Sequence, residues 1–127
     1  MRYKDEWVEY LEAVNEQKHI NNLTKKLKNK KVLLYGAGMV AEVLIDKYDL
    51  SGLNIVGISD KKFEKDNSDI WHNIKTINPQ KIKEIDFDII LFTLKEHANI
   101  ERYFKEQNIC TQTGSLIKKD KKFAIKK

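Results

Sequence analysis

The feature that most constrains this chain is the stretch KKVLLYGAGMVAEVLI, residues 30–45. Its first part, Lys31 to Tyr35, is mainly apolar, which is typical of a strand buried on both faces of a parallel sheet. A Gly-Ala-Gly turn follows, and apolar residues then recur at helical spacing from Met39 to Tyr48. A second apolar run covers residues 54–58, after Ser51-Gly52. Strand, tight turn, helix and strand in this order predict a βαβ unit.

The segment before this unit is predicted to be helical over residues 3–29. Its apolar positions recur at spacings of three and four, first at Trp7, Tyr10, Leu11 and Val14, and again at Ile20, Leu23 and Leu27. Asn21-Asn22 is expected to divide the segment into two helices, with Asn22 or Thr24 capping the second. The first helix needs a surface to cover its apolar stripe, either on its own domain or on a partner subunit.

The segment after the unit continues to alternate. Residues 59–73 are polar and predict a loop, and residues 74–77 predict a short strand. Pro79, with Asn78 as its cap, predicts a helix start with Ile82 and Ile85 facing inward. Residues 87–93 predict a strand, residues 95–107 a helix, and residues 109–117 a last short strand.

This alternation predicts an α/β fold with a doubly wound, mostly parallel Rossmann-like sheet and helices on both faces. The expected organisation is an N-terminal helical segment, a nucleotide-binding domain and a basic tail, at residues 1–29, 30–117 and 118–127 respectively.

Composition narrows the class of protein. A chain of 127 residues fits one domain, and no run is long and apolar enough for a transmembrane segment. The single cysteine, Cys110, excludes an internal disulfide and favours a cytoplasmic location. The net charge of +5 comes from the two ends, because residues 32–117 carry ten Lys and Arg against thirteen Asp and Glu. Specific nucleic-acid binding is therefore not expected.

The hexapeptide Gly36-Ala37-Gly38-Met39-Val40-Ala41 fits the pattern G-x-G-x-x-[G/A]. In this pattern the first glycine makes the sharp turn, and the second leaves space for a pyrophosphate beside backbone N–H groups. The third position, here Ala41, needs a small side chain so that helix and strand pack closely. The N-terminus of the helix then attracts an anion with its unpaired N–H groups.

An acidic residue at the end of the next strand supports this interpretation. Asp60 lies 24 positions after Gly36 and would accept hydrogen bonds from ribose hydroxyls. The neighbouring Lys61-Lys62 would instead suit a 2′-phosphate, so both NAD and NADP are possible cofactors. Asp60 could also simply begin a turn. Thr93, which ends a predicted strand, could line the same crevice together with Lys95 and His97.

The stretch from Val32 to Lys62 resembles a known group of domains. Tyr35-Gly36-Ala37-Gly38 and Val56-Gly57-Ile58-Ser59-Asp60 are similar to motifs in the N-terminal Rossmann-like domain of bacterial polysaccharide-biosynthesis proteins, which include nucleotide-sugar dehydratases and epimerases. The resemblance covers about residues 30–110 and includes related stand-alone domains. It implies a nucleotide or nucleotide-sugar ligand and a role in surface-polysaccharide assembly.

The catalytic features of those enzymes are absent from the sequence. There is no second glycine motif, and no tyrosine has a lysine four residues after it. No metal-ligand spacing occurs among the three histidines and Cys110. The sequence therefore favours a nucleotide-binding accessory or regulatory domain without catalytic activity of its own. The alternatives are a small NAD(P)-dependent nucleotide-sugar-modifying oxidoreductase or epimerase, and a non-binding module that dimerises through its N-terminal helix.

Overall fold

The computed structural model describes residues 2–65, 68–93, 102, 104–106, 109 and 111–118. The α-helices are α1 (Arg2–Ala13), α2 (Glu16–Lys26) and α3 (Met39–Lys47), and the 3₁₀ helices are η1 (Lys61–Glu64) and η2 (Pro79–Glu84). The strands are β1 (Lys31–Tyr35), β2 (Asn54–Ser59), β3 (Ile70–Trp71), β4 (Ile74–Ile77), β5 (Ile89–Phe92) and β6 (Gln112–Ser115).

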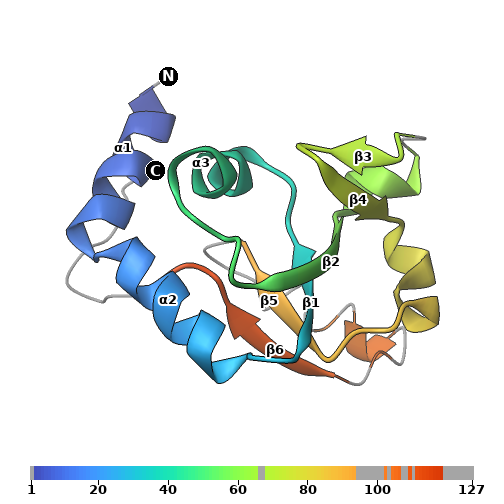
Figure 1. The fold of residues 1–127 in the computed structure, drawn as a ribbon. Coiled ribbons are helices and arrows are strands. Elements are labelled where there is room, and N and C mark those ends of the chain that lie inside the picture. The colour runs from blue at the N-terminus through green and yellow to red at the C-terminus, as the bar shows by residue number, and fades with distance from the viewer. Residues whose placement is uncertain are drawn as a thin grey trace.

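These strands form one six-stranded sheet in the order β3-β4-β2-β1-β5-β6. All neighbours are parallel except β3 and β4, which form an antiparallel hairpin. From β1 the chain builds β2 and β4 on one side, and then crosses to build β5 and β6 on the other (Figure 1). The fold is therefore α/β with a mostly parallel sheet, as the alternating sequence pattern predicted, and the carboxyl ends of its five parallel strands share one edge.

Alternate residues of β1 point into two separate cores. Val32 and Leu34 belong to the larger cluster, which the helices α1, α2 and α3 cover, and Leu33 belongs to the smaller one. The smaller cluster includes Ile82 of η2 and Phe104, so both faces of the sheet are covered. The prediction that residues 31–35 are buried on both faces is confirmed, because Val32 to Tyr35 are all buried.

The break between the first two helices lies at Val14-Asn15, and the predicted break at Asn21-Asn22 is wrong. Asn15 has a φ of 56°, a left-handed conformation that asparagine tolerates better than most residues. Asn22 and Thr24 lie inside α2, where Thr24 donates its hydroxyl to the carbonyl of Ile20 at 2.9 Å, so neither caps a helix.

The apolar stripe of α1 packs into the chain's own larger core, where α3 is its main helical neighbour. Trp7 and Leu11 are at most 1% exposed and share the larger core with Val32 and Leu34. Ile20 of α2 is also fully buried there. Figure 1 shows α1 and α2 along one side of the molecule, with α3 between α1 and the sheet. Of the two surfaces that the sequence left open for α1, its own domain or a partner subunit, α1 therefore packs on its own domain.

The region from 59 to 85 is more ordered than its composition suggested. The predicted loop at 59–73 contains η1 and β3, and β3 turns into the predicted strand β4 through His72-Asn73. Pro79 does begin a helix, with the Asn78 side chain accepting a hydrogen bond from Gln80 N at 2.9 Å. That helix is the 3₁₀ helix η2, and it buries Ile82.

The C-terminal predictions are met where the structure describes the chain. The predicted last strand is β6, parallel to β5. Of the helix predicted for residues 95–107, Arg102 and residues 104–106 are helical. Lys95, His97, Cys110 and the tail after Lys118 lie outside the described residues.

Candidate functional site

The glycine turn joins the carboxyl end of β1 to the start of α3. Gly36 has a φ of 119°, which side-chain-bearing residues rarely adopt, and its N–H donates to the carbonyl of Ser59 in β2 at 2.8 Å. Ala37 and Ala41 are 1% exposed, so both small side chains are packed between helix and sheet. The first glycine and the third motif position therefore do what the motif requires of them.

Gly38 caps the N-terminus of α3 in an extended conformation, with φ of −114°. In the part of the chain that the structure describes, a Cβ atom at Gly38 would meet nothing within 4 Å beyond its chain neighbours. The carbonyl of Gly38 accepts the first bond of the helix, from Glu42 N at 3.1 Å. No described residue accepts a hydrogen bond from the N–H groups of residues 38–41. With respect to the described residues, open space therefore lies beside four donors that have no acceptor.

Asp60 lies at the carboxyl end of β2, close to this turn, as predicted. Its Oδ2 accepts a hydrogen bond from Ala37 N at 2.7 Å, and its Oδ1 accepts one from Lys62 N at 3.1 Å. The second bond caps η1. Asp60 therefore begins a turn, which is one of its two predicted roles, and it also lies against the glycine loop. Its contact with ribose hydroxyls stays a prediction.

Lys62 closes the same loop from the other side. Its ammonium donates to the carbonyl of Ala37 and lies 5.2 Å from the ring centroid of Trp71. Lys61, which was proposed as a ligand for a 2′-phosphate, is exposed in η1. Ala37 is therefore held on both sides, because its N–H donates to Asp60 and its carbonyl accepts from Lys62.

Thr93 follows β5 and is only 2% exposed. Its hydroxyl lies within hydrogen-bond distance of the carbonyls of Tyr35, at 3.1 Å, and Gly36. Its N–H also donates to Tyr35 O at 3.0 Å. Thr93 therefore stabilises the glycine turn from the end of β5. Its single hydroxyl proton is donated to one of these two carbonyls.

The β3–β4 hairpin completes the surroundings of the loop. His72 and Asn73 at its tip have φ of 48° and 67°, and the ring of His72 lies 4.3 Å from that of Trp71. His72 Nε2 lies 3.3 Å from Glu42 Oε2, which is in the first turns of α3. Sequence reasoning missed this contact, because Trp71 and His72 are in a polar stretch with no strand pattern.

The structure thus brings together most of the predicted site residues. Beside the residues just placed, Met39 and Val40 form the first turn of α3, where both side chains are half-buried against the larger core. Lys95 and His97 cannot be placed, since they lie outside the described residues. Among the residues described, no group of three or more His, Cys, Asp or Glu could hold a metal ion, and no helix could cross a membrane.

Comparison with known proteins identifies a family. The model of the family described as C2185-like, N-terminal, matches residues 28–113, which is more than half of the chain. The chain therefore belongs to this family. The matched region runs from the residues just before β1 into β6 and contains the glycine loop, Asp60 and Thr93. Searches of curated proteins and of solved structures found no match.

Proposed function

We propose that this chain is a nucleotide-binding accessory or regulatory domain that holds a phosphate of NAD(P) or of a nucleotide sugar at the start of α3. The observation that carries the proposal is the space at Gly38, beside N–H groups of residues 38–41 for which the described part of the chain offers no acceptor. Such a helix start attracts phosphate through its donors and its dipole. In this proposal the sheet is a doubly wound Rossmann-like sheet.

The strand order supports this placement. β1 lies between β2 and β5. The connection after β1 leads to β2 on one side of β1, and the connection after β4 leads to β5 on the other side. In open α/β sheets, ligands bind outside the carboxyl ends of the strands at such a reversal. The glycine loop, Asp60 and Thr93 follow β1, β2 and β5, and therefore lie at this point. The proposed role in bacterial surface-polysaccharide assembly rests on the resemblance of residues 30–110 alone.

A non-binding structural domain is the second candidate, and a specific observation favours it. Ser59, Asp60, Lys62 and Thr93 already satisfy the backbone polar groups of residues 36 and 37, so the turn keeps its shape without a ligand. A ribose hydroxyl at Asp60 would have to share the carboxylate with two backbone donors. Dimerisation through α1 gains no such support, because Trp7 and Leu11 are buried in the chain's own core.

The two candidates are separated by calorimetric titration of the full chain with NAD, NADP, ATP and a UDP-sugar. We expect at least one of these compounds to bind with a one-to-one stoichiometry. Gly38→Val should abolish that binding, because its side chain would fill the open space, while its φ of −114° suits valine. If none of the four compounds binds to wild type, the structural candidate is correct and the proposal is wrong.

A further inference from the structure

A cavity of about 450 Å³, widely open to solvent, lies between α2 and the end of β6, away from the glycine loop. Four of its lining residues, His19, Asn22, Leu23 and Lys26, have the spacing of one face of α2. The opposite wall is made of Ser115, Ile117 and Lys118, just where β6 ends. Figure 1 shows α2 running alongside this end of β6. The volume is in the range of small-molecule sites.

The wall formed by residues 115–118 is held in place from α1 and α2. Lys118 N donates to Glu16 Oε1 at 2.8 Å, and its carbonyl accepts the Tyr10 hydroxyl at 2.5 Å. His19 Nε2 donates to Ser115 O at 3.0 Å. Because the wall is fixed in this way, a ligand would not have to order it on binding, which favours affinity.

Among the described residues that line the cavity, the charged side chains have one sign of charge. Lys26 and Lys118 line it, and no Asp or Glu is among its lining residues. Within the described part of the chain, neither lysine lies within 4.0 Å of a carboxylate oxygen, although the charge of Lys118 acts on the nearby Glu16. The Asn22 amide makes no side-chain hydrogen bond to a described residue. Leu23 is half-buried and Ile117 is 2% exposed, so the cavity also has an apolar side.

One carboxyl group lies behind the wall. Glu16 is fully buried, and this burial raises its pKa to about 7. At neutral pH it is therefore less ionised than an ordinary carboxyl group, and it opposes an anion in the cavity less than an ordinary carboxylate would.

We propose that this cavity binds a small organic anion. The anionic group, a carboxylate or a phosphate ester, lies between Lys26 and Lys118, and the Asn22 amide donates to it. The apolar part of the ligand lies against Leu23 and Ile117. The site is separate from the nucleotide site proposed above, because the glycine loop follows β1 whereas this cavity lies beyond β5, at β6.

The test is NMR titration of the ¹⁵N-labelled full chain with hexanoate and with hexyl phosphate, with hexanol as a neutral control. We expect saturable shifts of the Asn22 side chain and of the backbone amides of residues 115–118. Hexanol should bind at least tenfold more weakly than the better anion. The stronger of the two anions identifies the natural anionic group as carboxylate or phosphate.

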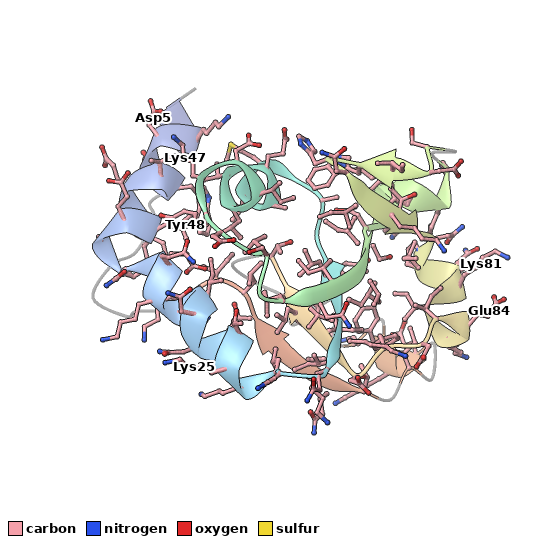
Figure 2. All side chains as sticks on the ribbon, viewed as in Figure 1. Asp5, Lys25, Lys47, Tyr48, Lys81 and Glu84 are labelled. Atoms are coloured by element: carbon pink, nitrogen blue, oxygen red, sulfur yellow. The ribbon has the colours of Figure 1, made fainter. Side chains whose placement is uncertain are left out.

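Two charge variants form a matched pair. Lys26→Glu should weaken the better anion at least tenfold. Lys25→Glu, one position earlier on the same helix but outside the cavity, should weaken it less than twofold; Lys25 is labelled in Figure 2. Both lysines are exposed, so both variants should fold. Leu23→Trp should block the cavity without a change of charge.

Three results would overturn the proposal. They are the absence of saturable shifts at residues 115–118 with either anion, equal weakening by Lys25→Glu and Lys26→Glu, and equal binding of hexanol. Equal weakening by the two variants would mean a diffuse attraction to a basic helix. Gly38→Val should leave hexanoate binding unchanged, so failure of the nucleotide site and failure of this site can be told apart.

Discussion

The glycine loop and the contact between α2 and the end of β6 both join segments that are far apart in the sequence, but they satisfy their polar groups differently. At the loop, Gly36 N–H, Ala37 N–H and the carbonyls of Gly36 and Ala37 all have partners. At the other contact, Glu16 Oε1 accepts a hydrogen bond from Lys118 N, but the buried Oε2 has no partner among the described residues.

This difference indicates what each region depends on. The loop is fixed by several bonds from the fold itself, so its shape persists without a ligand. The donors of residues 38–41, for which no described residue is an acceptor, are available to a ligand. The contact at Glu16 depends instead on a proton, because a buried charge with an unpartnered oxygen is costly. Changes at the two regions should therefore produce different kinds of effect.

The largest effect is expected at Glu16. Its folded-state pKa of about 7 lies above the usual 4.5, so ionisation opposes folding. The penalty is absent below about pH 4.5, grows between pH 4.5 and 7, and levels off at about 3 kcal/mol above pH 7. Glu16→Gln should remove this dependence and should make the protein more stable than wild type at pH 8.5.

Urea denaturation of wild type and Glu16→Gln at pH 5 and pH 8.5 measures this difference. Glu12→Gln is the control, since Glu12 is an exposed carboxylate on α1. A stability difference between wild type and Glu16→Gln that is the same at both pH values would show that Glu16 does not titrate as described.

The next largest effect compares two glycines of the loop. Gly36→Ala should destabilise the fold by about 1–3 kcal/mol, because the φ of 119° is strained for alanine. Gly38→Ala should cost less than about 1 kcal/mol, because its backbone is extended and the space is open. Thermal unfolding of both variants measures the difference. Equal destabilisation would contradict the distinction between Gly36, whose backbone conformation needs glycine, and Gly38, which has space for a side chain.

Asp60→Ala should have a smaller effect on stability, of about 1–2 kcal/mol, because two backbone N–H groups lose their acceptor. The sequence alone would assign Asp60 to ribose binding or to a simple turn. If Asp60 only began a turn, Asp60→Ala would change the free energy of unfolding very little. Asp60→Asn keeps one oxygen as an acceptor and should recover part of the loss. A change in nucleotide affinity without any change in urea midpoint would show that Asp60 serves the ligand alone.

The smallest effect is expected at the hairpin tip. The pair of Glu42 and His72 is partly exposed, with side chains 44% and 34% accessible, so its removal should cost less than about 1 kcal/mol. A double-mutant cycle with Glu42→Gln and His72→Gln gives the coupling. A coupling energy above 2 kcal/mol would place the hairpin among the structural supports of the loop, beside Asp60 and Lys62.

The sequence predicted the fold better than the details of the site. The runs at 31–35 and 54–58, with the Gly-Ala-Gly turn between them, define β1, β2 and α3, because hydrophobic periodicity and glycine conformation are local properties. The break at Asn15 could not be chosen over Asn21-Asn22, since any of the three asparagines tolerates a turn. Strand β3 has only two residues, which is too short for a pattern.

The contacts that decide the chemistry are not local. Asp60 was placed correctly, but its bond to Ala37 depends on how closely β2 and the loop approach each other. Glu16 carries a charge and gives no sign of burial in the sequence, because its partner Lys118 is 102 positions away. Such pairings follow from tertiary packing, which residue spacing does not encode.

The most direct test of the nucleotide site is the position of the amides that respond when a nucleotide is added to the ¹⁵N-labelled full chain. The proposal predicts that NAD, NADP, ATP or a UDP-sugar shifts the resonances of residues 38–41 most strongly. It also predicts that Gly38→Val removes these shifts and leaves the rest of the spectrum in place. A spectrum in which no nucleotide moves the resonances of residues 38–41 would contradict the proposal.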